Sequence, residues 1–440
     1  MIKKIFLITT TVMIPECASS KFETMSVEAS SNASKANGNA SSKEKKAETC
    51  VKKKLYLNAI YEGELDKDGN RHGKGRLKWI NGSVYEGDWK NDKKEGKGRK
   101  IWAKGKHARG IRVYEGDWKD DNRDGEGKMV YANGDVYEGN WKNDNNEGKG
   151  MMTFRNGDVY EGDWKEGKKE GKGKMVYADG TVYEGDFEND KAEGKGKVTF
   201  QDGSIYEGDW KDDEMEGRGK ITLQGRYIYE GDWKNSKKEG KGKIVFRNGN
   251  TYEGDFKNNK MEGKAKIIYA SGDVYEGNIE DNLMDGKGKY VWANGDVYEG
   301  DFKNDKMKGK GKIVYANGNT YEGDMKNNKK EGDGKYVYAN GDAYEGEFKD
   351  DVAEGKGKFT FANGSIYEGG WKNNVRDGKG KIVYANGNVY EGGWKNNKRE
   401  GEGKIVYADG DVYEGEFKNG KIEGKGKVVC ADGTVYEGKF

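Results

Sequence analysis

The sequence predicts an all-β fold: an elongated, curved single-layer antiparallel β-meander built from 23-residue hairpin repeats. The tripeptide Tyr-Glu-Gly occurs seventeen times between Tyr61 and Tyr436, and the last fourteen intervals are each 23 residues long. A fixed period of this size indicates a repeat architecture. Within each repeat, two short segments alternate between charged residues and apolar residues or glycines, which is the period of a β-strand. The 71 glycines and single proline also favour hairpins.

Residues 160–182 show how one hairpin is expected to form. Tyr160, Gly162 and Trp164 share one face of the first strand, whereas Glu161 and Asp163 share the other. A four-residue loop at 166–169 would place oppositely charged residues across from each other. The expected pairs are Lys165 with Glu170, Asp163 with Lys172, Glu161 with Lys174, Trp164 with Gly171, Gly162 with Gly173 and Tyr160 with Met175.

The connection to the next repeat runs through Ala178-Asp179-Gly180. A three-residue loop with a left-handed Gly180 keeps each side chain on its own face of the sheet. The register that follows pairs Val176 with Val182, Met175 with Tyr183 and Lys174 with Glu184. Each lysine-bearing strand then lies between two acidic strands. The residues expected to build the structural aromatic face include Tyr160, Trp164, Tyr177, Tyr183 and Trp210.

These motifs resemble a known family. Tyr-Glu-Gly-x-Trp/Phe, followed by Glu-Gly-x-Gly, an aliphatic-aromatic run and Asn/Asp-Gly, is similar to the MORN (membrane occupation and recognition nexus) repeat. The resemblance covers residues 55–440 and implies a curved single-layer sheet that acts as a scaffold. It also implies binding to acidic phospholipids, a role proposed for the family.

The amino-terminal segment divides into two parts. Residues 1–19 combine two lysines, an apolar run and a small-residue stretch, which predicts a signal peptide and export to the cell envelope or medium. Cys17 is a candidate lipid anchor. The alternative is a cytoplasmic, membrane-peripheral protein with an apolar start. Residues 20–54 are polar and basic, which predicts a disordered linker ahead of the repeat array at 55–440.

One insertion breaks the charge balance of the array. The second repeat is six residues longer than the standard, and the surplus falls between Ala103 and Arg112. This stretch carries several cations and no acid, so it is a candidate loop for an anionic partner; the alternative is a tolerated surface insertion. Its candidate residues are Lys104, Lys106, His107, Arg109 and Arg112.

Composition and motifs argue against several functions. The net charge is only +2 although 36% of the residues are charged, so a nucleic-acid binder is not indicated. Neither His72 nor His107 has a nucleophile at motif spacing, no Cys/His cluster has zinc spacing, and Glu-Gly-Lys-Gly-Lys lacks the spacing of a phosphate loop. We therefore expect no enzyme, no cofactor and no metal.

Two functions from different classes remain. The first is a non-enzymatic scaffold for protein–protein interaction, exported and tethered by its amino-terminal arm. The second is a peripheral membrane protein that binds acidic phospholipids through basic residues. Ladder lysines opposite acids are already neutralised, which weakens the second interpretation. The array ends in half a repeat, so its last strand offers an edge for self-association.

Overall fold

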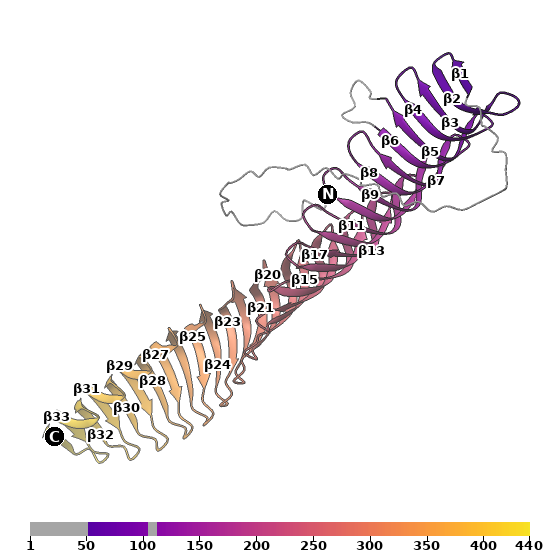
Figure 1. The fold of residues 1–440 in the computed structure, drawn as a ribbon. Coiled ribbons are helices and arrows are strands. Elements are labelled where there is room, and N and C mark those ends of the chain that lie inside the picture. Colours follow the sequence, from indigo (N-terminus) through magenta and orange to yellow (C-terminus); the bar gives the residue numbers. More distant parts are fainter. Residues whose placement is uncertain (1–51, 104–111) are drawn as a thin grey trace, which may run out of the picture. The chain divides into compact units, whose positions relative to one another are not determined.

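The computed structural model describes residues 52–103 and 112–440, which hold 34 strands and no helix (Figure 1). The chain forms two compact units. Unit 1 comprises the residues up to Gln201 together with Trp210–Glu214, and unit 2 comprises Asp202–Asp209 and Met215–Phe440.

The strands of unit 1 come in pairs of about seven and nine residues, one pair per repeat. They are β1 (Lys52–Tyr56), β2 (Ala59–Leu65), β3 (Arg71–Trp79), β4 (Val84–Lys90), β5 (Lys93–Trp102), β6 (Arg112–Lys119), β7 (Asn122–Val130), β8 (Val136–Lys142), β9 (Asn145–Thr153), β10 (Val159–Lys165), β11 (Lys168–Val176), β12 (Val182–Glu188) and β13 (Lys191–Thr199). Strand β14 (Ile205–Lys211) contributes residues to both units.

Unit 2 continues the same pattern. Its strands are β15 (Glu214–Leu223, whose first residue belongs to unit 1), β16 (Tyr227–Lys234), β17 (Lys237–Phe246), β18 (Thr251–Lys257), β19 (Lys260–Ile268), β20 (Val274–Glu280), β21 (Leu283–Val291), β22 (Val297–Lys303), β23 (Lys306–Val314), β24 (Thr320–Lys326), β25 (Lys329–Val337), β26 (Ala343–Lys349), β27 (Val352–Thr360), β28 (Ile366–Lys372), β29 (Val375–Val383), β30 (Val389–Lys395), β31 (Lys398–Val406), β32 (Val412–Lys418), β33 (Lys421–Val429) and β34 (Val435–Lys439).

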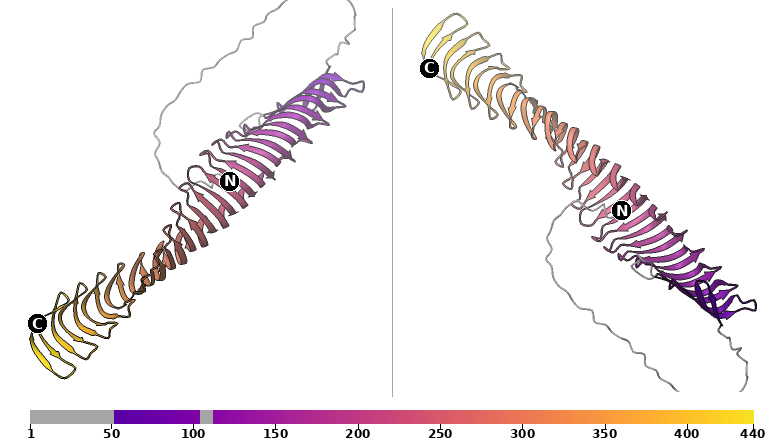
Figure 2. Two further views of the ribbon diagram at one scale, coloured as in Figure 1. Left: turned by 90° about the horizontal axis from the view of Figure 1, so that it is seen from below. Right: turned by 90° about the horizontal axis from the view of Figure 1, so that it is seen from above.

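Within each unit, every strand pairs antiparallel with its neighbours in the chain. Strands β11 and β12 illustrate this in unit 1, as do β21 and β22 in unit 2. In the described part of each unit, no second sheet or helix covers either face (Figure 2). The predicted single-layer antiparallel β-meander of 23-residue hairpin repeats is therefore confirmed.

The connection between repeats also has the predicted register. Val176 lies opposite Val182, Met175 opposite Tyr183 and Lys174 opposite Glu184. The loop is closed by the Tyr177 N–H, which donates to the Thr181 carbonyl at 2.8 Å, and Gly180 has a φ of 88°. A side chain at that φ would be strained, so the glycine is required by the turn.

The hairpin loop was predicted wrongly. It is a two-residue turn at Glu166-Gly167, with φ of 50° and 81°, rather than a four-residue loop. Positive φ at both positions suits the twist of a hairpin, and Asn, Asp and Gly tolerate it. Two residues of the second strand, Gly171 and Lys172, have no partner opposite them on the first strand and form a bulge next to Gly162. Gly171 has a φ of 61°.

This bulge changes part of the expected register. Glu161–Lys174, Gly162–Gly173 and Tyr160–Met175 pair as predicted. Beyond the bulge the predicted pairs are wrong: the observed pairs are Asp163 with Glu170, Trp164 with Lys169 and Lys165 with Lys168.

The core is a row of tyrosines, one from each Tyr-Glu-Gly except the last, whose Tyr436 is exposed. Tyr160 is fully buried, and its ring meets Trp164 and, from the next repeat, Phe187 edge-on, with centroids 5.2 and 5.0 Å away. Its hydroxyl donates to the Asp163 carbonyl at 2.9 Å. Tyr160, not Trp164 over Gly171, covers the glycines, because a Cβ at Gly173 would lie 2.5 Å from its ring. A larger residue there would displace the core tyrosine.

The amino-terminal boundary differs slightly from the expected one. Strand β1 begins at Lys52 and pairs with β2, so residues 52–54, which the sequence assigned to the linker, belong to the sheet. The remaining linker and the segment with Cys17 lie outside the described residues.

Candidate functional site

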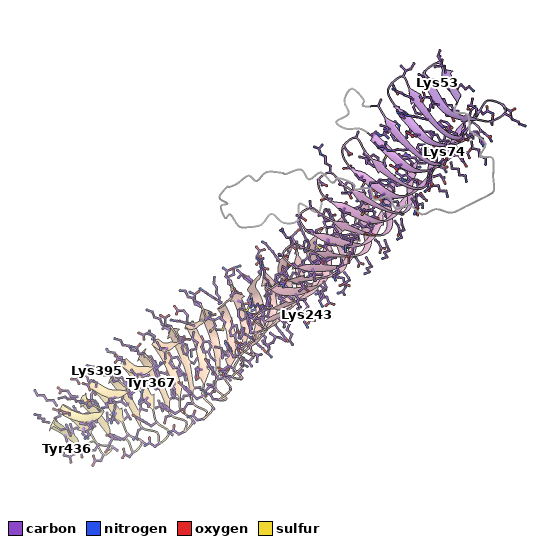
Figure 3. All side chains as sticks on the ribbon, viewed as in Figure 1. Lys53, Lys74, Lys243, Tyr367, Lys395 and Tyr436 are labelled. Carbon is purple, nitrogen blue, oxygen red and sulfur yellow. The ribbon has the colours of Figure 1, made fainter. Side chains whose placement is uncertain are left out.

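The sheet presents two chemically distinct faces. One, which we call the ladder face, carries the glutamates of Tyr-Glu-Gly and the lysines of Gly-Lys-Gly-Lys. Lys174 lies between Glu161 and Glu184, and its Nζ is 2.7 Å from a Glu184 carboxylate oxygen. Figure 3 labels lysines of this face in both units, among them Lys74 and Lys243.

A second row of ion pairs runs parallel to the first. Here lysines reach an aspartate of the next strand, as in Lys172–Asp186 at 2.6 Å and, in unit 2, Lys310–Asp324 at 2.8 Å. The pairs are largely exposed, so each adds little stability. Their consequence is electrostatic: most ladder lysines already have a carboxylate beside them.

Grooves run along the ladder face between the two charged rows. One of them, in unit 1, has a volume of about 1550 Å³ and crosses β5 to β12. Glycine backbone forms part of its lining, as at Gly150 and Gly162, between charged side chains such as Glu161 and Lys174. Two further grooves in unit 2 have volumes of about 1090 and 900 Å³.

The ladder is interrupted at a few positions that sequence analysis did not single out. Met151 stands where other repeats have a basic residue, opposite Glu138. Gly370 and Gly393 replace acids, so Lys356 and Lys379 face glycine. Comparison of each repeat with the consensus at these columns would have revealed these sites.

The opposite face, which we call the aromatic face, carries cations on rings. The Arg71 guanidinium lies 4.1 Å from the Trp89 ring centre, Lys94 Nζ 4.6 Å from Trp118, and Arg123 4.0 Å from Trp141. Such contacts are attractive because the ring face is electron-rich.

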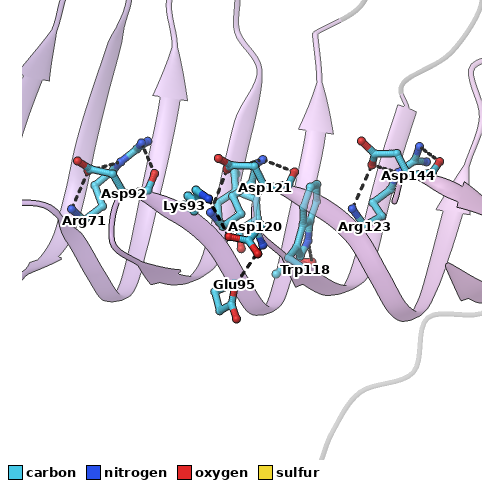
Figure 4. A network of polar contacts seen from close by, with 12 residues as sticks. Arg71, Asp92, Lys93, Glu95, Trp118, Asp120, Asp121, Arg123 and Asp144 are labelled. Atoms are coloured by element: carbon cyan, nitrogen blue, oxygen red, sulfur yellow. Dashed lines mark hydrogen bonds and ion pairs between the residues drawn. The ribbon is translucent and has the colours of Figure 1, made fainter. Parts of the chain in front are cut away.

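Each of these three cations also has a carboxylate partner from the next hairpin turn, and Figure 4 shows this for Arg71 and Arg123. The partners are Asp92 at 3.0 Å from Arg71, Asp121 at 2.8 Å from Lys94, and Asp144 at 2.8 Å from Arg123. Burial acts to raise the pKa of Asp121, but hydrogen bonds from Lys94 outweigh it and hold that pKa below its usual value. These three cations are therefore each paired with an acid.

Lys100 is a further cation on the aromatic face. Other repeats place an apolar residue at its position, such as Met129 or Met175. Its Nζ lies 4.8 Å from the Trp102 ring centre, 5.6 Å from Trp79 and 5.9 Å from Trp118.

The Lys100 ammonium makes no hydrogen bond or ion pair with another described residue. Burial, with a further contribution from Lys94, lowers the pKa of Lys100 to about 8. Sequence analysis missed this residue, although a lysine in an otherwise apolar column was a visible signal.

Of the candidate loop for an anionic partner, only Arg112 is described. It begins β6, is exposed, and its guanidinium lies 5.0 Å from the Trp102 ring centre. Lys104, Lys106, His107 and Arg109 lie outside the described residues. Lys100 and Arg112 therefore share one tryptophan.

The predicted aromatic residues occupy the aromatic face. Tyr160, Trp164, Tyr183 and Trp210 are buried, and Tyr177 is half-buried. Burial raises the pKa of Tyr160 and Tyr183 above the usual tyrosine value. These rings are structural, because they pack against one another.

The described residues contain no group of three or more His, Cys, Asp or Glu side chains able to hold a metal ion. None of them forms a helix long and apolar enough to cross a membrane.

The chain has weak similarity to several solved structures. The TCP domain of Drosophila melanogaster SAS-4, in complex with a proline-rich motif, is 18% identical, covers 40% of this chain and 88% of its own, and has a TM-score of 0.24. The TCP10 domain of Danio rerio CPAP with a STIL peptide is 14% identical, with coverage of 52% and 92% and a TM-score of 0.29. These scores are too low to support an argument. No curated protein matches the chain.

The family comparison is decisive. The MORN repeat model matches sixteen times, at residues 61–84, 85–107, 114–136, 137–159, 160–182, 183–205, 206–224, 229–251, 252–274, 275–297, 298–320, 321–343, 344–366, 367–389, 390–412 and 413–435. Such repeats generally form non-enzymatic scaffolds for protein or lipid interaction. The chain belongs to the MORN-repeat family.

Proposed function

We propose that this protein is a non-enzymatic scaffold that holds protein partners along its ladder face. The observation that carries the proposal is the repeated pairing of ladder lysines with carboxylates, as at Lys174–Glu184 and Lys172–Asp186. Paired charges leave a polar surface with little net charge, which suits a protein of mixed charge better than an anionic bilayer.

The grooves support the same proposal. Their glycine-containing lining lets a partner's main chain approach the sheet, and the flanking carboxylates and ammonium groups offer acceptors and donors along the groove. Repetition of the pattern in each unit would allow one extended partner to make many similar contacts.

The second candidate is a peripheral membrane protein that binds acidic phospholipids. The observation that favours it is the group of cations without acids between Lys100 and Arg112, together with the basic arm. Each basic residue near an anionic surface contributes about 1 kcal/mol of attraction. Most ladder lysines have carboxylate neighbours, so these few residues would have to supply the binding.

We also propose export and tethering by the amino-terminal arm. Residues 1–19 have the order of a signal peptide, and Cys17 is a candidate for acylation. Mass spectrometry of protein purified from its host should find a mature start near Ser19 or Ser20, or an acylated Cys17. Recovery of an intact Met1 from the cytosol would contradict export.

Strand β34 is proposed as a surface for self-association. Among the described strands it pairs with β33 alone, and all five of its residues are exposed. Exposed strand edges pair readily with other chains. Light scattering of the full chain and of a Tyr436→Pro variant would show whether this edge joins copies.

The scaffold proposal is tested by photo-crosslinking. A photoreactive residue in place of Met151, which is exposed beside the unit 1 groove, should capture a protein in host extract. The control places the same residue at Ile80, which is 80% exposed in a turn. A defined protein adduct at position 151 and not at 80 supports the scaffold; lipid adducts alone at 151 would contradict it.

A further inference from the structure

We propose that Lys100 and Arg112, on either strand of the β5–β6 pair, bind a phosphate monoester carried by a protein partner. The two residues are diagonal neighbours, because Lys100 lies opposite Tyr114 and Arg112 lies opposite Trp102. Both cations contact the Trp102 ring, at 4.8 and 5.0 Å from its centre. This site is on the aromatic face, opposite the ladder grooves.

Three other cations on the aromatic face have a counter-charge that Lys100 and Arg112 lack among the described residues. Arg71, Lys94 and Arg123 on the same face each have a carboxylate within 3.0 Å. Lys100 and Arg112 have no ion-pair partner among the described residues. The chain segment that connects them, from Ile101 to Ile111, contains no Asp or Glu, so it supplies no carboxylate either.

Two acids that act electrostatically on Lys100 already have other partners. They are Asp121 and Asp144, which are hydrogen-bonded to Lys94 and Arg123. The negative charge of these two carboxylates is therefore already balanced by Lys94 and Arg123. Both positive charges at Trp102 are left for a ligand to neutralise.

The charge and the hydrogen-bonding geometry of this site favour phosphate over carboxylate as the ligand. A phosphate monoester carries a charge of about −1.5 to −2 near neutral pH, which matches two uncompensated cations, whereas a carboxylate carries one charge. The guanidinium can donate two parallel hydrogen bonds to phosphate oxygens. The half-buried tryptophans exclude water from one side, which strengthens these bonds.

The titration of Lys100 agrees with this assignment. Burial and Lys94 lower its pKa to about 8, so the free site holds the ammonium weakly. A bound dianion would favour the charged amine and raise that pKa. Binding above pH 8 should therefore take up protons.

The test uses the full chain and calorimetric titration with end-blocked Ala-phosphoserine-Ala. Unphosphorylated Ala-Ser-Ala, Ala-Glu-Ala and inorganic phosphate serve as comparison ligands. The variants come from the chain's own repeats: Lys100→Met takes the residue found at Met175, and Arg112→Thr the residue found at Thr181. Lys128→Met, which takes the residue found at Met151, removes one charge from the ladder face as a control.

We expect the phosphopeptide to bind wild type and the Lys128→Met control equally. Each site variant should weaken binding at least about tenfold, since each removes a charge-assisted contact. Ala-Glu-Ala should bind more weakly than the phosphopeptide, and Ala-Ser-Ala not at all. Proton uptake on binding at pH 8.5, measured in two buffers of different ionisation enthalpy, should disappear in Lys100→Met.

Three results would overturn the inference. Unchanged affinity in both site variants would show that phosphate binds elsewhere. Equal binding of the glutamate and phosphoserine peptides would remove the selection for phosphate. Tighter binding to inorganic phosphate or phosphoinositide vesicles than to the phosphopeptide would show that the phosphate is not protein-borne. The claim that a protein carries the phosphate rests on the scaffold proposal. The crosslink at position 151 tests the scaffold separately, because it lies on the other face of the sheet.

Discussion

The tyrosine and the bulky residue four positions later form the unit of stability in each repeat. Trp164 is 6% exposed, contacts Tyr137 and Tyr160 edge-on at 5.2 Å, and its indole N–H donates to the Gly150 carbonyl at 3.1 Å. One side chain thus joins two repeats through packing and a backbone hydrogen bond. Ladder residues such as Glu161 are exposed and lack such contacts.

Trp164→Ala should therefore destabilise unit 1 by about 3–5 kcal/mol, because it leaves a cavity in the aromatic row. Glu161→Ala should cost less than about 1 kcal/mol, since it removes only exposed charge. Urea unfolding followed by circular dichroism measures both. If the glutamate variant is the less stable one, the assignment of the two faces is reversed.

Lys100 predicts a pH dependence of opposite sign to that of an ion pair. Its pKa falls from an ordinary 10.5 to about 8 in the folded chain, chiefly through burial and Lys94, partly offset by Asp144 and Asp121 and aided by Arg123. Between these values the unfolded chain binds a proton that the folded chain does not, so stability rises with pH.

Lys100→Met removes this penalty. The variant should be more stable than wild type by about 1–2 kcal/mol at pH 7, a discounted value because Lys100 is partly solvated. The difference should shrink as pH rises from 8 towards 10.5. Paired denaturation curves across this range test it; a difference that stays constant with pH would rule out the Lys100 titration as its cause.

At the scale of the hairpin, the two-residue turn connects successive repeats. Asn189 and Asp190 have φ of 49° and 73°, and an Asp190 carboxylate oxygen accepts a hydrogen bond from the Lys169 backbone N–H at 2.9 Å. The Asp190 N–H donates to the Lys169 carbonyl at 3.1 Å. The turn of one hairpin is therefore hydrogen-bonded to the start of the second strand of the hairpin before it.

Asp190→Ala should cost about 1–3 kcal/mol, because it loses the carboxylate bond and places alanine at positive φ. Asp190→Gly loses the same bond but tolerates the φ, as Gly167 does at the equivalent position, so it should cost about 1 kcal/mol less. Thermal unfolding separates the two variants. Equal losses would show that the backbone conformation contributes nothing.

The hairpin also shows how far the sequence predicts this fold. The loop at 178–180 was predicted correctly because only a three-residue loop keeps Val176 and Val182 on one face. The turn at 166–167 was predicted wrongly because charge pairing favoured another register, and the bulge at Gly171 leaves no periodic trace.

The candidate site was only partly predictable. Arg112 was identified from the run of cations, but Lys100 was not. Its surroundings depend on Trp79 and Trp118, which lie on strands β3 and β6 and come together only in the sheet. Sequence spacing within one strand does not reveal such a cluster.

At the scale of the whole molecule, the same buried tyrosine, with a raised pKa, recurs in successive repeats. Burial raises the pKa of the core tyrosines, to about 12 for Tyr61, Tyr298, Tyr367 and Tyr390. Above the ordinary tyrosine pKa of about 10, the unfolded chain loses protons that the folded chain keeps, so stability falls as pH rises.

We therefore predict that the chain unfolds cooperatively in alkali, with many tyrosines ionising together. Absorbance at 295 nm and circular dichroism should change at the same pH, between about 10 and 12. Tyrosines that ionise well before the sheet unfolds would contradict the burial of this row.

Charge balance is the second property of the whole molecule. The chain carries 80 basic and 78 acidic residues, and in the described part most ladder lysines lie beside carboxylates. Weak attraction of the ladder face to an anionic surface thus depends on these lysines being neutralised by the carboxylates beside them. An anionic surface would then meet cations without nearby acids chiefly in the arm and around Arg112, with few along the described ladder, such as Lys356 and Lys379.

Co-sedimentation with anionic vesicles at about 0.15 M salt tests this claim most directly, since screening there acts over about 8 Å. The comparison is between the full chain and a variant in which the arm lysines and Lys104, Lys106, Arg109 and Arg112 are replaced by glutamine. We predict that the variant will not sediment with vesicles but will retain the protein partner captured at position 151. Salt-sensitive sedimentation of the variant would show that the ladder lysines are free to bind lipid, which contradicts the account.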